Sequence, residues 1–66
     1  MIGYTLSYIC FDQQVRLNNF VRWLEQTRTP VQHRLFQSAH LNGQYYLLSH
    51  LRQERLDEIF MEFDKL

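Results

Sequence analysis

The sequence has little of what usually reinforces or interrupts a small fold. Its 66 residues include one cysteine, one proline and two glycines. Because Cys10 is alone, a disulfide within the chain is excluded, and a lone cysteine is typical of a reducing compartment. No run approaches the roughly 20 apolar residues of a membrane span, and the apolar start lacks a basic region and a signal cleavage site. We therefore expect a cytoplasmic protein that does not enter membranes.

Net charge is also missing, because seven basic residues balance seven acidic ones. The chain as a whole has no field that would attract nucleic acid or an anionic membrane. A chain of this length has room for one core and buries only about 60% of its unfolded surface. Such cores typically supply about 3–5 kcal/mol unless a metal, a disulfide or a second subunit adds to it. We expect a single domain, residues 1–66, of marginal stability.

The first segment alternates with a period of two. The residues that share one face are Ile2, Tyr4, Leu6, Tyr8 and Cys10. This alternation, with aromatic and β-branched residues, predicts a strand over residues 2–10. We expect Cys10 to point toward the core with Tyr8 and to be buried and inert. Asp12 then offers a side-chain oxygen to cap the helix that follows.

Two later segments have helical periodicity. The apolar positions of the first are Leu17, Phe20, Val21 and Leu24, and those of the second are Leu56, Ile59, Phe60, Phe63 and Leu66. Each set forms one stripe along a helix, and this stripe must be buried. Thr29-Pro30 ends the first helix, because the residue before a proline disfavours the α region. The second helix has Ser49 or His50 as possible caps, and Arg52 would be a poor one.

Asn42-Gly43 lies between the two helices and predicts a β-hairpin with strands at residues 31–41 and 44–50. A type I′ turn needs positive φ at both central positions, and asparagine followed by glycine meets this need. The turn would place Leu41 opposite Gln44 and Ala39 opposite Tyr46.

The element order is therefore βαββα, an α+β fold with two helices on one face of a three-stranded antiparallel sheet. The right-handed crossover rule places the first strand beside the third, which is a ferredoxin-like layout lacking its last strand. The first strand then ends the sheet, and residues 4–9 contain no proline or charge to protect that edge. An unprotected edge favours pairing with another strand. The alternative is that shortness or the final residues, 64–66, protect it.

No pattern indicates a catalytic, cofactor or metal site. His33, His40 and His50 lie on or beside the hairpin, but a zinc site needs three or four converging ligands. No nucleophile, phosphate-binding or dinucleotide-binding motif is present. We expect no catalytic residues, no metal ligands and no cofactor.

Nucleic-acid binding is a second possibility, because sheet aromatics can stack on bases while arginines contact phosphates. The arginines are Arg16, Arg22, Arg28, Arg34, Arg52 and Arg55. Those of the first helix point in three directions, so they form no basic stripe. Trp23 lies outside the apolar stripe of that helix, two turns from Arg16 and near Asn19. Tryptophan together with arginine is typical of protein-binding hot spots.

The opening YTLSYICFD, the helix after it and the hairpin leading into YYLLSHLRQERLDEI resemble a group of small ferredoxin-like proteins. This group includes the CRISPR-associated small endonuclease-like subunit and the GhoS-type antitoxin endoribonuclease. The resemblance implies a metal-binding carboxylate at the end of the first strand and a fourth strand used in dimerisation. Here Ile9 stands at the carboxylate position, Asp12 follows the strand, and the fourth strand is absent.

The sequence therefore favours a non-enzymatic interaction module that acts as a homodimer or by edge-strand pairing with a partner protein. Its size and composition are similar to those of inhibitors and regulators of phage, mobile-element or toxin–antitoxin type. The predicted binding residues are Tyr4, Leu6 and Tyr8 on the first strand, and Arg16, Asn19 and Trp23 on the first helix. The alternative is an RNA-binding or metal-dependent RNA-cleaving protein that uses Asp12 and the arginines.

Overall fold

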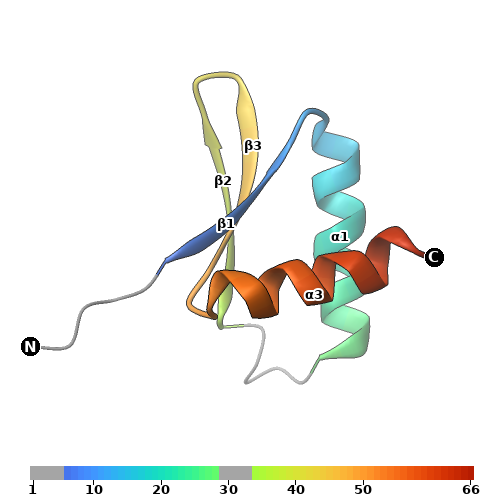
Figure 1. The fold of residues 1–66 in the computed structure, drawn as a ribbon. Helices are drawn as coiled ribbons and strands as arrows, with labels where there is room; N and C mark the ends of the chain where they lie inside the picture. Colours follow the sequence, from blue (N-terminus) through green and yellow to red (C-terminus); the bar gives the residue numbers. More distant parts are fainter. Residues whose placement is uncertain (1–5, 29–33) are drawn as a thin grey trace, which may run out of the picture.

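The computed structural model describes residues 6–28 and 34–66, which form one three-stranded sheet with two helices on one side of it (Figure 1). The elements in chain order are β1 (Ser7–Phe11), α1 (Gln14–Thr27), β2 (Phe36–Leu41), β3 (Gln44–Ser49) and α3 (Gln53–Asp64). Both strand pairs are antiparallel and the sheet order is β1-β3-β2. The predicted α+β class, element order and strand order are confirmed. The parts of the predicted strands at residues 2–5 and 31–33 lie outside the described residues.

The hairpin forms as Asn42-Gly43 predicts. Asn42 has φ 53° and Gly43 has φ 76°, so both turn residues occupy the left-handed region. Leu41 pairs with Gln44 and Ala39 pairs with Tyr46. The turn therefore fixes the register, and the register decides which side chains of β2 and β3 share a face.

The core lies between the helices and one face of the sheet, which we call the covered face. Its buried apolar residues are Phe11, Leu17, Phe20, Leu24, Leu47, Leu56 and Ile59. Phe20 is completely buried, and its ring centre lies 5.8 Å from that of Phe11 and 5.0 Å from that of Phe63. Both predicted helical stripes therefore contribute to one core, with Phe20 at its centre.

The buried face of β1 is the opposite of the one expected. Ser7 and Phe11 are buried against the helices, whereas Tyr8 is 56% exposed and Cys10 is exposed. The prediction that Cys10 is buried is wrong. Both faces of this strand carry apolar residues, so alternation alone does not select one. Ser7 is tolerated inside because its hydroxyl donates a hydrogen bond to the carbonyl of Leu51.

The helix starts also differ from expectation, because neither helix has a side-chain cap. The residue before α1 is Gln13 instead of Asp12, and the Gln13 carbonyl accepts the amide of Leu17. Arg52 occupies the equivalent place before α3. The Ser49 hydroxyl instead accepts a hydrogen bond from the amide of Leu51 and holds the connection into α3. α1 ends at Thr27, and the predicted stop at residues 29–30 lies outside the described residues.

The turn yields a test of backbone conformation alone. Gly43→Ala should lower the free energy of unfolding by about 1 kcal/mol, because alanine at positive φ is strained. No atom lies within 4 Å of the added methyl group, so no clash contributes. Asn42→Gly is the matched control and should change stability by less than about 0.5 kcal/mol. Urea unfolding followed by circular dichroism measures both, and equal stability of the two variants would contradict the turn assignment.

A second test compares two positions on α3. Leu56 is 0% exposed and Met61 is 55% exposed. Leu56→Ala should remove about 2–5 kcal/mol, which is comparable to the whole stability of a domain of this size, so this variant should be largely unfolded. Met61→Ala should stay within about 0.5 kcal/mol of the parent. Thermal unfolding measures both, and a folded, equally stable Leu56→Ala protein would contradict the assigned core.

Candidate functional site

The side of the sheet turned away from the helices carries exposed apolar side chains, among them Tyr8 and Leu41. We call it the open face, and its side chains are Tyr8, Cys10, Gln37, Ala39, Leu41, Gln44, Tyr46 and Leu48. Five of them line a shallow hollow of about 240 Å³: Tyr8, Ala39, Leu41, Tyr46 and Leu48. Leu41 is 61% exposed. None of the eight side chains is an acid or a base of the Asp, Glu, Lys, Arg or His type, so the open face has no formal charge at neutral pH.

Polar atoms of the open face lie around two neighbouring tyrosines. The rings of Tyr8 and Tyr46 meet edge to face with centres 5.8 Å apart. Cys10 pairs with Tyr46 across the strands, and its thiol donates to the side-chain oxygen of Gln44 at 3.3 Å. Partial burial, and then the Cys10 thiol and Tyr8 hydroxyl, raise the pKa of Tyr46 above its ordinary value of 10.0. At physiological pH the Tyr46 hydroxyl is therefore a neutral donor and acceptor.

Several arginines lie in the helical layer instead. Arg16 forms an ion pair with Asp64 and lies over the ring of Phe60, 5.7 Å from its centre. Arg28 lies 3.6 Å from Glu62 and stacks over the ring of Trp23. These contacts join α1 to the end of α3, so the two arginines hold the helices together on the side away from the open face.

The structure separates the predicted binding residues into two groups. Leu6 and Tyr8 are exposed at the open face or its border, and Tyr4 lies outside the described residues. Trp23 is half-buried and packs on Phe20 and Phe63, with ring centres 5.8 Å and 5.5 Å away. Asn19 and Arg16 are exposed on the same helix as Trp23. Binding by this helical group remains a prediction.

The outer edge of β1 is partly satisfied by the chain itself. Tyr8 donates its backbone amide to the side-chain oxygen of Gln53 at 3.2 Å, and its carbonyl accepts from the Gln53 amide nitrogen at 3.0 Å. The side chain of Gln53 therefore takes the place of one residue of a neighbouring strand. Outward backbone groups alternate along an antiparallel strand, so Leu6 and Cys10 are the positions of this edge that Gln53 does not cover. No sequence pattern indicates this contact, because it depends on where α3 begins relative to β1.

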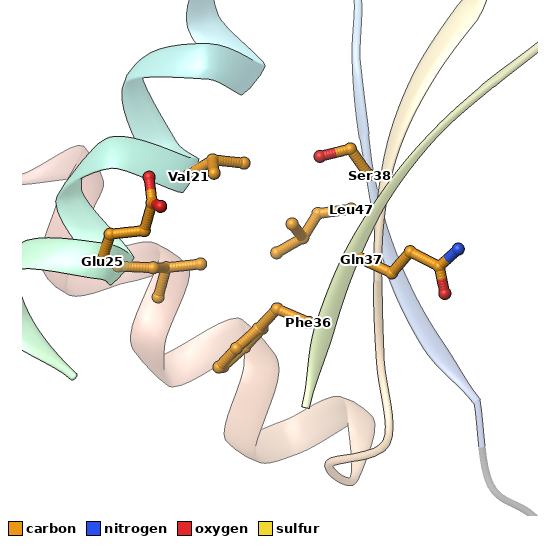
Figure 2. Close-up of a pocket in the computed structure, with 7 residues that line it drawn as sticks. Val21, Glu25, Phe36, Gln37, Ser38 and Leu47 are labelled. Carbon is orange, nitrogen blue, oxygen red and sulfur yellow. The ribbon is translucent and has the colours of Figure 1, made fainter. Parts of the chain in front are cut away.

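A second hollow lies at the opposite side of the sheet, between α1 and β2. Figure 2 shows Val21 and Glu25 of α1 facing Phe36 and Ser38 of β2, with Leu47 of β3 behind them. Its volume is about 180 Å³. Val21 belongs to the apolar stripe that the sequence predicts for α1, so one wall of this groove could be foreseen. The groove itself depends on how far α1 lies from the edge of β2, which the sequence pattern does not predict.

The described residues contain neither a cluster of metal ligands nor a membrane-spanning helix. They contain no group of three or more His, Cys, Asp or Glu side chains that could hold a metal ion. His40 stacks on Tyr45 with ring centres 4.6 Å apart, and His33 lies outside the described ranges. Asp12 is exposed beyond the end of β1. In residues 6–28 and 34–66, no helix has the length and apolar character needed to cross a bilayer.

A scan against models of protein families, a search of curated proteins and a search of solved structures each found no match for this chain.

The contact between Gln53 and Tyr8 can be tested by hydrogen exchange. Gln53→Ala should speed exchange of the Tyr8 amide about fivefold, since one hydrogen bond contributes about 1 kcal/mol. Gln26→Ala is the matched control, because Gln26 is an exposed glutamine on the other helix. NMR-detected exchange measures both, and an unchanged Tyr8 rate in Gln53→Ala would show that this edge is not capped.

Proposed function

We propose that this chain is a small non-enzymatic protein-interaction module that works as a homodimer, with the open face as the surface between the two copies. The observation that carries the proposal is the one-sided coverage of the sheet. Helices bury one face, while Tyr8, Leu41 and their neighbours leave an apolar, uncharged face in water. Covering such a surface removes apolar area from water, at roughly 25 cal/mol per Å².

A second copy is the occupant that the charge of this face favours. A two-fold dimer brings identical patches together, so any charge on the patch meets the same charge on the partner. The open face has none, and its hydrogen-bonding groups are tyrosine hydroxyls and glutamine amides, which both donate and accept. A marginal 66-residue domain also gains stability when a second subunit covers its surface.

The size of the face sets the expected strength. Standard interfaces bury about 800 Å² on each partner, and three strands of five or six residues offer a small surface in comparison. We therefore expect a reversible dimer with a Kd on the order of micromolar.

The dimer leaves the helical layers on its two outer sides. Each layer presents exposed Arg16 and Asn19 beside half-buried Trp23. We propose that these residues form the surface for a protein target, which would make the dimer a regulator or inhibitor with two equivalent binding sites.

RNA binding is the alternative that one observation favours, because the paired rings of Tyr8 and Tyr46 are the kind of aromatic surface on which bases stack. Among the described residues the lining of this hollow contains no arginine or lysine, and the adjoining hollow, which shares Leu48, has one arginine, Arg34. Arg16 and Arg28 are engaged in the helical layer. Phosphate contacts supply much of the affinity for nucleic acid, so the open face fits a protein surface better.

The test is a charge placed on the open face at the end of β2, next to the hairpin turn. Leu41→Glu should weaken dimerisation at least tenfold, because two-fold symmetry places two carboxylates in the contact. Met61→Glu is the matched control, since Met61 is similarly exposed on α3 and should leave the dimer unchanged. Sedimentation velocity over a concentration series measures the Kd of each variant.

The outcomes of this series separate the proposals. Loss of the dimer in Leu41→Glu alone supports the open face as the interface. A parent protein that stays monomeric at the highest concentration contradicts the proposal. Salt-sensitive RNA binding by that monomer, with NMR shifts at Tyr8 and Tyr46, would favour the RNA alternative instead.

A further inference from the structure

The outer edge of β2 is the second place where this sheet presents unpaired backbone groups. The hairpin ladder uses the backbones of Leu41, Ala39 and Gln37, and it continues to the Leu35 carbonyl, which accepts the amide of His50. Alternation then directs the amides and carbonyls of Phe36, Ser38 and His40 outward. Within residues 6–28 and 34–66 no strand pairs with this side of β2.

The outward-facing residues stand directly beside the groove under α1. The side chains of Phe36 and Ser38 are on the covered face and line the groove together with Val21, Leu24 and Leu47 (Figure 2). Residues of an added strand that pair with this edge would point alternate side chains into the same groove. Its volume of about 180 Å³ is below the roughly 300–1,000 Å³ of small-molecule pockets. It has the size for one apolar side chain.

The charge of the residues that line the groove indicates which side chains a bound segment would carry. Among the described residues that line this groove Glu25 is the one that is charged, and Figure 2 shows its carboxylate on the α1 side of the hollow. The side chain is exposed, and no ion pair joins it to another described residue. A lysine or arginine near the apolar side chain of the occupant would therefore find an available carboxylate.

We propose that β2 binds an extended segment of a partner protein as a fourth strand, with an apolar side chain in the groove and a basic side chain beside Glu25. In this mode of peptide recognition, hydrogen bonds between the backbones of β2 and the added strand provide affinity. The groove and Glu25 provide selectivity for the side chains of that strand. This site is separate from the open face, so it stands or falls independently of the dimer.

The opposite edge is less suited to the same role. At β1 the Gln53 side chain already occupies the outward groups of Tyr8, the second residue of the five-residue strand. At β2 no contact of this kind occupies the outward positions Phe36, Ser38 and His40 among the described residues, and the first two of them line an apolar groove. The structure therefore favours β2 as the edge that receives a partner strand.

The probe is a blocked seven-residue peptide of threonines with a central leucine and a lysine two positions away on each side. Leucine and both lysines then share one face of the extended peptide, whichever direction it runs. Titration into the isotope-labelled protein should shift the NMR signals of the Phe36, Ser38 and His40 amides and of Glu25. The same peptide with glutamates in place of lysines should bind at least threefold more weakly at low salt.

Two variants distinguish strand addition at β2 from nonspecific binding of the peptide. Ser38→Pro removes an outward amide but no hydrogen bond between β2 and β3. The variant should therefore fold normally and bind the lysine peptide about tenfold more weakly. Glu25→Lys should reverse the preference, so that the glutamate peptide binds more tightly than the lysine peptide. Glu58→Lys, at an exposed glutamate on α3, is the matched control and should leave the preference unchanged.

The proposal is overturned if the lysine peptide gives no shifts at millimolar concentration or shifts confined to the open face. It is also overturned if Glu25→Lys and Glu58→Lys change the preference equally. Should Ser38→Pro fail to fold, the Glu25→Lys reversal decides the question alone.

Discussion

The packing of both helices against a single face of the sheet is the constraint on which the rest of the structure depends. Phe20 is 0% exposed at the centre of this layer, in contact with the rings of Phe11, Phe60 and Phe63. The helices and the covered face bury seven apolar residues against each other and leave the groove between α1 and β2 open. In the described residues nothing covers the other face, so Tyr8, Leu41 and their neighbours remain in water.

The ion pairs between the helices contribute little to the stability of this layer. Arg16 with Asp64 and Arg28 with Glu62 join the helices. The carboxylate side chain of each pair is more than half exposed, and such pairs contribute about 0–1 kcal/mol each. These contacts also hold both arginines in the helical layer. The chain therefore separates its chemistry in space, with an uncharged apolar sheet face on one side and charged, aromatic helices on the other.

Much of the fold could be predicted from local patterns. Asn42-Gly43 fixed the hairpin and its register, and the two stripes around Phe20 and Leu56 located both helices. The buried face of β1 could not be predicted, because apolar residues occupy both faces and the decisive contact, Ser7 with Leu51, spans 44 residues. The Gln53 contact with Tyr8 and the groove beside β2 could not be predicted either. Both depend on how the helices are placed on the sheet, and the periodicity of the sequence does not determine this placement.

The central claim is that the face left bare by the helices is covered by a second copy of the chain. Cys10 is the one cysteine of the sequence and is exposed on that face, so it reports directly on coverage. The measurement is the rate at which a bulky thiol reagent labels Cys10 as protein concentration increases. The account predicts that labelling slows as the dimer forms, with no change in the unfolded protein. A rate that is the same at every concentration would contradict it.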